Sequence, residues 1–378
     1  MTPDVMPRSA ERRFVHIDCL RGLAALLVAL HHFLDDSLKM TGTTNRFASG
    51  LHTLLYDYVD MGRLGVLLFF FLSGYCIANS ILRPGSRPVA RFAVNRILRV
   101  YPAYWLSLAI AAALYGSQFD VATYAVNIPL VQTFVGQRDV MGVYWTLPVE
   151  LGFYAFCIAL FLVGFMGSAR RLCAVGAALF GFAVVAALAR ASFGVALPYA
   201  WPFFLSLMVS SAALRRMDDL GIDRAPYLRW AVPTALIGML VIAVGVYGDP
   251  GAHDKTWYRE FIPSASALCL FLFFSYVYRP SSRVLAYLGL TSYSLYLFHS
   301  LVFDAVAGLP PGILRMIAAT GAGGVIVILL AATIAVASLT YFVVEKPGIR
   351  LGHRLARVIA ARADSAGISD VQTARRTP

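Results

Sequence analysis

Long apolar stretches follow one another along this chain, separated by short polar or Pro/Gly-containing segments. A helix needs about 20 mostly apolar residues to cross the hydrocarbon core of a bilayer. Because 59% of the residues are hydrophobic and only 14% are charged, a soluble fold would leave large apolar patches exposed to water. The sequence therefore predicts an all-α integral membrane protein with about ten transmembrane helices.

The apolar stretches also predict how the chain is threaded through the bilayer. We expect the spans at residues 17–34, 64–82, 101–116, 145–166, 172–189, 199–214, 230–248, 261–278, 292–308 and 317–344. Ten crossings place both termini on one side, and most Lys and Arg residues then fall on that side. The positive-inside rule makes it the cytoplasmic side. This topology accounts for the net charge of +12, so we expect no nucleic-acid partner.

The chain is expected to form one membrane domain with short ends. Residues 1–13 are polar and basic and predict a cytoplasmic N-terminal segment. Residues 14–350 contain all the apolar stretches. Residues 351–378 are basic and polar, and we expect a disordered cytoplasmic tail there. The loop at 117–144 is moderately apolar and is expected to lie in the membrane interface or to re-enter it.

The first apolar stretch carries an arginine and a histidine on one helical face. Arg21 and His32 are 11 residues apart, so on a helix they lie within about 20° of each other and about 16 Å apart along the axis. Ionisable groups at membrane depth are costly and usually face a cavity in which they serve a function. The alternatives are an interfacial anchor for Arg21 and a packing hydrogen bond for His32. His31 points about 100° away and is expected to pack against neighbouring helices.

A cluster of arginines precedes the third apolar stretch. Arg96 and Arg99 are three residues apart and therefore project together from a helix. Guanidinium groups bind phosphates through paired hydrogen bonds, so these side chains predict an anion site. The alternative is that they only set the topology. In the second stretch, Ser73 and Gly74 interrupt a very apolar run, either for a function or for close helix packing.

Carboxylate and imidazole groups also occur in later stretches. Glu150 lies just inside the outer boundary of the fourth span, where a lone carboxylate needs a partner. His32 lies at a comparable depth and is the natural candidate, while Tyr154 is one turn further on the face of Glu150. His299 in the ninth span and Glu345 at the end of the tenth are either structural or functional. The sequence shows no metal-site spacing, no Gly-rich phosphate loop and no serine nucleophile elbow.

Six motifs in a fixed order resemble those of the membrane-bound acyltransferase 3 family, the multi-spanning O-acyltransferases of bacterial cell-surface glycans. They occupy residues 21–32, 65–74, 96–105, 145–154, 292–299 and 341–347. Each motif alone is moderately specific, whereas six in the right order are strongly specific. One position departs from the pattern, since Leu67 stands where the family usually has an acidic residue.

The resemblance implies an O-acyltransferase that moves an acyl group, commonly acetyl, from acyl-CoA to a hydroxyl of a surface or exported polysaccharide or its lipid-linked precursor. Acyl-CoA is then a substrate, and no permanently bound cofactor and no metal are implied. In this scheme His32 is the general base and Glu150 orients it. The residues expected to bind acyl-CoA are Arg21, Arg96, Arg99 and Tyr101, and the supporting residues are Ser73, Gly74, Trp145, Tyr154, His299 and Glu345.

The expected partners are acyl-CoA, a polysaccharide or lipid-linked glycan, and the lipid bilayer, and the expected location is the bacterial inner membrane. The sequence leaves a homo-oligomer open. A transporter or flippase for a glycan or acyl intermediate is the alternative function, because it also needs charges inside the membrane. Paired short or broken helices in two halves of the chain would favour the transporter, and none stand out in the sequence.

Overall fold

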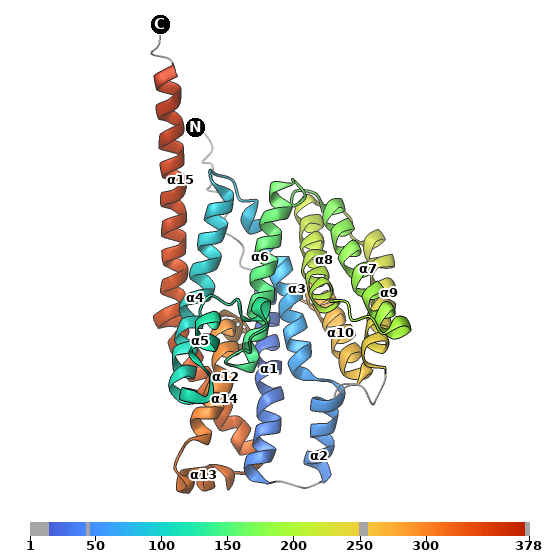
Figure 1. Ribbon diagram of the computed structural model, residues 1–378, viewed down its shortest axis with the longest axis vertical. Helices are drawn as coiled ribbons and strands as arrows, with labels where there is room; N and C mark the ends of the chain where they lie inside the picture. The colour runs from blue at the N-terminus through green and yellow to red at the C-terminus, as the bar shows by residue number, and fades with distance from the viewer. Residues whose placement is uncertain (1–14, 43–45, 249–255, 375–378) are drawn as a thin grey trace, which may run out of the picture.

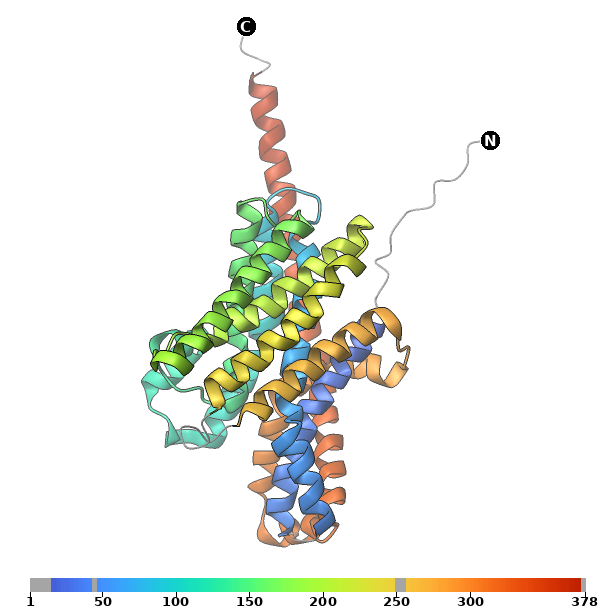
Figure 2. The ribbon, with the colours of Figure 1, turned by 90° about the vertical axis from the view of Figure 1, so that its right-hand side faces the viewer.

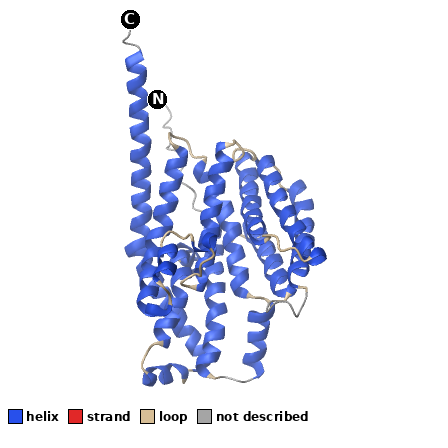
Figure 3. Ribbon diagram, in the orientation of Figure 1, coloured by secondary structure: helices blue, strands red, loops and turns tan. Residues whose placement is uncertain are grey.

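The computed structural model describes residues 15–42, 46–248 and 256–374, without the side chains of residues 78–79, 117 and 364–374. Within these ranges all regular secondary structure is helical (Figure 1, Figure 3). The predicted all-α class is therefore confirmed. The expected N-terminal segment 1–13 lies outside the described residues.

Fifteen α-helices and several short segments of other helical types make up the described chain. The α-helices are α1 (Val15–Thr41), α2 (Arg46–His52), α3 (Met61–Ile81), α4 (Pro88–Tyr115), α5 (Val121–Asn127), α6 (Thr146–Leu162), α7 (Ala169–Phe193), α8 (Ala200–Leu220), α9 (Ala225–Tyr247), α10 (Trp257–Leu272), α11 (Arg283–Leu290), α12 (Ser292–Ala307), α13 (Pro311–Ala318), α14 (Gly321–Thr340) and α15 (Lys346–Ala374). The 3-10 segments are Gly116–Gln118, Gln132–Val135 and Gly142–Trp145, and the π-helical segments are Thr53–Tyr58, Phe273–Val277 and Tyr341–Glu345.

Several of these helices have the length and composition of membrane spans. In the described part of the chain eight helices pass this test, and there are nine if α12 and α13, which meet at an angle of 115°, form one broken span. The multi-pass architecture is thus confirmed. The expected span at 199–214 corresponds to α8, whose last turns are charged, and the span at 292–308 corresponds to α12, which has only 16 residues. The full count of ten and the side of the termini remain predictions.

The helices are arranged around α1 and α3. Helix α1 contacts α3, α11, α12 and α14, while α3 also contacts α8 and α10. Helices α7 and α9 pack further out, next to α8 and α10 (Figure 1, Figure 2). Helix α4 packs against α12 and α15, and α6 packs against α3, α4 and α8. The central helices are therefore covered by neighbouring helices, and polar side chains can be placed between them.

Glycines allow the central helices to approach one another closely. A Cβ atom at Gly65 would lie 2.5 Å from the carbonyl oxygen of Ala24, so α3 and α1 touch backbone to backbone at this point. A Cβ atom at Gly74 would overlap the carbonyl oxygen of Met208 on α8. Small residues at helix interfaces are typical of membrane bundles, because van der Waals packing replaces the hydrophobic effect there. The packing alternative for Gly74 therefore agrees with the structure.

The two ends of the bundle differ in charge. Figure 1 shows the start of α4 and the outer part of α15 at the upper end, with α2 and α13 at the lower end. The segment before and within the first turns of α4 contributes Arg83, Arg87 and Arg91 to the upper end. We call the upper end the basic end and the lower one the opposite end.

Helix α15 corrects one prediction. The sequence predicts a disordered tail from residue 351, whereas the structure shows a continuous helix to Ala374. Two glycines explain why its first part is held on the bundle. A Cβ atom at Gly348 would lie 2.6 Å from the carbonyl oxygen of Leu98, and Gly352 faces Asn95 in the same way. The polar composition of the segment hides this glycine-mediated packing against α4.

The 117–144 loop is folded and is attached to α4 by hydrogen bonds. Three consecutive carbonyl oxygens accept from aromatic side chains of α4: Asn127 from Tyr104 (2.5 Å), Ile128 from Trp105 (3.0 Å) and Pro129 from Tyr101 (3.0 Å). These donors belong to the Tyr-Pro-x-Tyr-Trp part of the motif at 96–105. That part of the motif therefore fixes the loop, and only the arginines that precede it face the interior.

Candidate active site

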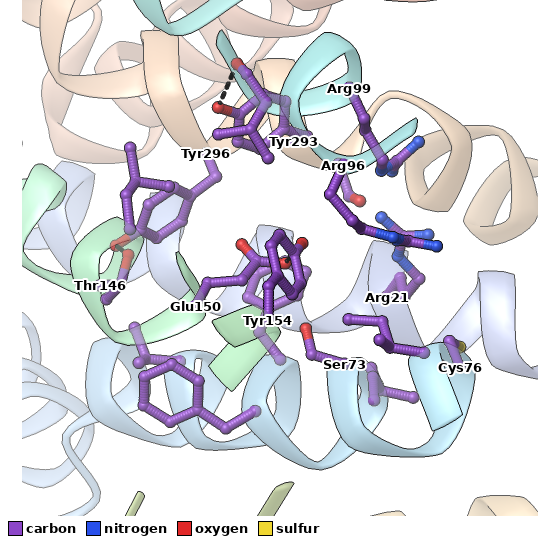
Figure 4. Close-up of a pocket in the computed structure, with 18 residues that line it drawn as sticks. Arg21, Ser73, Cys76, Arg96, Arg99, Thr146, Glu150, Tyr154, Tyr293 and Tyr296 are labelled. Carbon is purple, nitrogen blue, oxygen red and sulfur yellow. Dashed lines mark hydrogen bonds between the residues drawn. The ribbon is translucent and has the colours of Figure 1, made fainter. Parts of the chain in front are cut away.

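An internal cavity of about 100 Å³ lies between α1, α3, α4, α6 and α12. Its polar lining consists of Arg21, Ser73, Cys76, Arg96, Arg99, Thr146, Glu150, Tyr154, Ser292, Tyr293 and Tyr296. Figure 4 shows the three arginines on one side of the cavity and Thr146 and Tyr296 on the other, with Glu150 and Tyr154 between them. The structure thus brings together the three arginines, the carboxylate and the serine that the sequence singles out.

The carboxylate of Glu150 is held by a neighbour on its own helix. The hydroxyl of Tyr154 donates a hydrogen bond of 2.5 Å to Oε1 of Glu150. The guanidinium carbon of Arg96 lies 5.7 Å from the centre of the Tyr154 ring. A carboxylate away from bulk water is stabilised by hydrogen bonds and nearby cations. Glu150 is therefore a member of the arginine-lined cavity and not an isolated charge facing lipid.

A second carboxylate pairs with the arginine cluster. Oε1 of Glu345 lies 3.7 Å from Nη1 of Arg99, and Ser294 donates a hydrogen bond of 2.8 Å to Oε2. Glu345 is only 1% exposed and ends the π-helical segment Tyr341–Glu345 between α14 and α15. A π-helical segment has an extra residue per turn, which changes the direction in which its side chains point. Such segments are frequent at functional sites. Glu345 thus positions Arg99 and compensates its charge.

The structure places His32 away from the cavity of Glu150. The ring of His32 lies against His299 on α12, with 5.1 Å between ring centres, and against His31 at 5.2 Å. His32 is absent from the residues that line the cavity. The described residues show no contact between His32 and Glu150, so the expected pairing does not hold in this structure. The physical reason is that equal depth says nothing about the direction in which each side chain leaves its helix.

His299 is the partner that the structure gives to His32. Its Nδ1 lies 2.7 Å from the carbonyl oxygen of Tyr296. Because a carbonyl oxygen only accepts, Nδ1 carries the proton and Nε2 of the neutral ring is a bare acceptor. His299 is fully buried, and its Nε2 has no hydrogen-bond partner among the described residues. An imidazole held in one tautomer with a free lone pair can accept a proton from a neighbour.

Tyr296 separates the histidine pair from the cavity. Its hydroxyl donates to the carbonyl oxygen of Val143 at 2.8 Å and accepts from Thr146 at 2.9 Å. The ring lines the cavity and lies 6.0 Å from the ring of His299, centre to centre. The sequence notes the hydroxyl groups around residue 296 but gives this tyrosine no role. Only the helix packing shows that it forms the boundary between the two groups.

Three of the other candidates have packing roles. Trp145 packs against Phe70 and Phe204 and does not line the cavity. Gly74 serves the contact with α8 described above. Tyr101, which the sequence predicts to bind acyl-CoA, instead faces the 117–144 loop. It lines neither this cavity nor the second cavity that is described below. Tyr101 directly follows the arginine pair in sequence, but its side chain leaves the helix in a different direction.

Replacing Tyr101 by phenylalanine is therefore expected to leave the KM for the acyl donor within about twofold of the wild-type value. The lost hydrogen bond to Pro129 is expected to lower the free energy of unfolding by about 0.5–1.5 kcal/mol. Donor titrations and thermal unfolding of the purified protein check the two effects separately. If the donor KM of this variant rises as much as that of Arg96→Ala, Tyr101 does contribute to donor binding.

A second polar cluster lies toward the opposite end and was not found from the sequence. Arg63 on α3 forms an ion pair with Glu260 on α10, which is 3% exposed. His31 lies 3.8 Å from Asp60 and stacks on Tyr56, with 4.2 Å between ring centres. The signal in the sequence is the presence of charges at the edges of two apolar stretches, where charged residues ordinarily mark the ends of membrane spans.

A further cavity of about 600 Å³ adjoins the inner one at the basic end. The two cavities share Arg21, Cys76, Arg96 and Arg99 as lining residues. We call the outer cavity the vestibule. No group of three or more His, Cys, Asp or Glu side chains in the described part of the chain is placed to hold a metal ion.

The fold and the site define a multi-pass membrane protein with an internal, arginine-lined chamber that is reached from its basic end. Residues 14–342 match the sequence profile of the acyltransferase 3 family, described as an acyltransferase domain, and the chain belongs to this family. It is therefore an enzyme, an O-acyltransferase. Family membership decides against the transporter alternative as the primary function.

Three curated relatives are similar to this chain. A Komagataeibacter xylinus protein named "Putative membrane-bound transacylase BcsY" is 26% identical over 93% of this chain and 86% of its own length. Nodulation protein 10 of Rhizobium leguminosarum bv. viciae is 29% identical over 24% of this chain and 30% of its own length. Protein 2 in the picA locus of Rhizobium radiobacter is 29% identical over 33% of this chain and 54% of its own length. No solved structure matches the chain significantly.

Proposed function

We propose that this protein transfers an acyl group, most simply acetyl, from acyl-CoA to a hydroxyl of a cell-surface or exported polysaccharide or of its lipid-linked precursor. We further propose that it does so in the inner membrane of a bacterium, with the basic end in the cytoplasm. The observation that carries the proposal is the chamber in which arginines from two helices meet a carboxylate and several hydroxyl groups inside the bundle. The family and the transacylase relative support the reaction type.

The donor end of the reaction follows from charge. CoA carries several phosphate charges, and Arg21, Arg96 and Arg99 present guanidinium groups where the vestibule and the inner cavity meet. Charge-assisted hydrogen bonds from guanidinium groups to phosphate are strong and geometrically specific. In the proposed arrangement the pantetheine arm extends from these arginines into the inner cavity. The thioester then extends past Glu150 and Tyr154 to Tyr296, next to the histidine pair and away from bulk water that would hydrolyse it.

The acceptor end follows from the position of the histidine pair. His32 lies 11 residues beyond Arg21 on α1, about 16 Å further toward the opposite end. We propose that the acceptor hydroxyl arrives from that end and loses its proton to His32, which serves as general base. The oxygen attacks the thioester carbon, the new C–O bond forms and the C–S bond breaks. The departing CoA sulfur takes up the proton, so that the imidazole is neutral again.

Two residues have supporting roles in this scheme. His299 holds the ring of His32 from the side of α12, since the two ring centres are 5.1 Å apart. Tyr296 lines the cavity and lies beside His299, so the thioester and the acceptor hydroxyl are proposed to meet at its ring. The sequence predicts that Glu150 orients His32. In the structure-based proposal Glu150 instead holds Tyr154 and Arg96 in position around the donor.

The proposed function is tested by comparing O-acyl groups on surface polysaccharide from cells with and without this protein. Mass spectrometry of the polysaccharide is expected to show one type of O-acyl group that disappears with the gene and returns with a plasmid copy. A second measurement uses labelled acetyl-CoA and purified protein in vesicles. Identical O-acyl patterns in the two strains, together with no consumption of acetyl-CoA, would reject the proposal.

Glu150→Gln is expected to reduce turnover about tenfold or more while the protein still folds and inserts. The amide keeps the size of the side chain and accepts the hydrogen bond from Tyr154, but it removes the negative charge among the arginines. Turnover and donor KM of the purified variant, with thermal unfolding as the control for folding, measure the effect. Normal turnover in a well-folded variant would show that the charge of Glu150 is not needed.

A further inference from the structure

The vestibule has a wall that lies outside the region matched by the family. It is enclosed between α4 and α15, and Ile349, His353, Ala356, Arg357 and Ala360 form the side contributed by α15. The family match ends at residue 342, before α15 begins. The α15 side of this wall therefore lies outside both the matched region and the six motifs.

The charges around the vestibule are strongly one-sided. Its lining contains six arginines and one histidine, and no Asp or Glu is found among the described residues that line it. Glu345 compensates Arg99 from behind, which leaves a large excess of positive charge. A cleft lined by charges of one sign attracts and concentrates a ligand of the opposite sign. A volume of about 600 Å³ is large for a single phosphate and suits a larger polyanion.

Helix α15 is fixed so that one of its faces stays turned to this space. Gly352 lies against Asn95 of α4, and Ser86 donates a hydrogen bond of 2.9 Å to the carbonyl oxygen of Ala360. Ala356 and Ala360 are four residues apart on the vestibule face and leave room for a ligand. Arg357 projects from the same face of this otherwise immobilised helix.

Polar atoms of α4 complete the wall opposite α15. Oδ1 of Asn95 and Nε of Arg96 are buried and have no hydrogen-bond partner among the described residues. Both residues line the vestibule. A buried acceptor and a buried donor without partners are unusual in a folded protein and point to a ligand that supplies the missing bonds. An amide oxygen fits an amino group such as that of adenine, and a guanidinium nitrogen fits a phosphate oxygen.

We propose that the vestibule binds the phosphorylated adenosine end of CoA and that Arg357 of α15 contacts its 3′-phosphate. This inference rests on the proposed use of acyl-CoA as donor. The diphosphate then lies at Arg96 and Arg99, where the vestibule meets the inner cavity, and the 3′-phosphate lies further out beside α15. Helix α15 thereby makes the enzyme select acyl-CoA over thioesters that lack the 3′-phosphate.

The test compares two donors with the full-length protein in phosphatidylcholine vesicles. Acetyl-CoA and acetyl-3′-dephospho-CoA carry the same thioester and differ only in the 3′-phosphate. The wild type is expected to show a KM about tenfold or more lower for acetyl-CoA. Arg357→Ala is expected to raise the KM for acetyl-CoA about tenfold, with less than a twofold change for the dephospho donor. Arg357→Lys is expected to restore part of the difference.

Arg354→Ala is the matched control, because Arg354 is an exposed arginine on the same helix that does not line the vestibule. The Arg354→Ala variant is expected to show the same difference in KM between the two donors as the wild type. Equal KM values for the two donors in the wild type, or equal effects of Arg357→Ala on both, would overturn the assignment of the 3′-phosphate site. If neither donor is consumed by the wild type, the proposed function itself fails, so the two failures are distinguishable.

A second arm distinguishes CoA from an anionic lipid headgroup as the source of the phosphate. The measurements are repeated in vesicles that contain phosphatidylglycerol. If the vestibule binds CoA, the effect of Arg357→Ala on the KM for acetyl-CoA is the same in both types of vesicle. A KM difference between wild type and variant that appears only with phosphatidylglycerol would assign Arg357 to the lipid and overturn the proposal.

Discussion

His32→Ala is expected to lower acyl transfer by about 10²–10⁴-fold without preventing insertion into the membrane. The reason is that a general base contributes a factor of this size and that no other imidazole takes the place of His32 beside His299. The measurement is turnover of acetyl-CoA by purified variant and wild type, with the amount of folded protein determined for each. The effect is expected in kcat more than in donor KM, because His32 does not line the cavity proposed for the donor.

His31→Ala is the control for this experiment. His31 is buried and faces Asp60 and Tyr56, on a different side of α1 from His299. Its loss is expected to reduce stability more than turnover. If His31→Ala is inactive and His32→Ala is nearly normal, the general base has been assigned to the wrong imidazole. If both variants are nearly normal, the chemistry does not use a histidine of α1.

Arg96→Ala is expected to raise the KM for acetyl-CoA about 10- to 150-fold. One lost charge-assisted contact to a phosphate costs about 1.5–3 kcal/mol, and each 1.4 kcal/mol is about a factor of ten. Arg96 lines both cavities and has no carboxylate partner of its own within the described residues, so its removal leaves no buried charge unpaired. Donor titrations at low and high salt provide the measurement, and the difference is expected to shrink as salt screens the phosphates.

Arg99→Ala is expected to have a similar effect on donor KM but a larger effect on folding. Its removal leaves the buried carboxylate of Glu345 without its cation, and loss of one partner of a buried pair is strongly destabilising. The double variant Arg99→Ala/Glu345→Gln is expected to recover stability and to keep the high donor KM. An unchanged donor KM in both Arg96→Ala and the double variant would show that these arginines only set the topology.

The distance between the donor cavity and the histidine pair has a consequence for the reaction. Glu150 and the arginines lie on one side of Tyr296, and His299 and His32 lie on the other. In the proposed mechanism the thioester and the acceptor hydroxyl meet only at Tyr296. Such an arrangement would limit hydrolysis, which is the competing reaction for any thioester near water.

The membrane class and the family are determined by the sequence alone. A bilayer requires about 20 apolar residues per crossing, and runs of apolar residues of this length can be recognised directly in the sequence. The same holds for the spacing of Arg96 and Arg99, since neighbours on one helix are related by fixed geometry. This spacing agrees with the structure, in which Arg96 and Arg99 line one cavity, because it involves only one helix.

The tertiary structure alone decided which side chains from different helices meet. Depth in the membrane suggested that Glu150 pairs with His32. The packing of α12 against α1 instead places His299 beside His32, and the packing of α6 against α3 and α4 leaves Glu150 among the arginines. Tyr101 turns to the 117–144 loop, and α15 becomes a wall of the vestibule through Gly348 and Gly352. A residue's position in the sequence fixes its height along a helix, whereas the direction it faces depends on how the helices rotate and pack, and close contacts at small residues set that rotation.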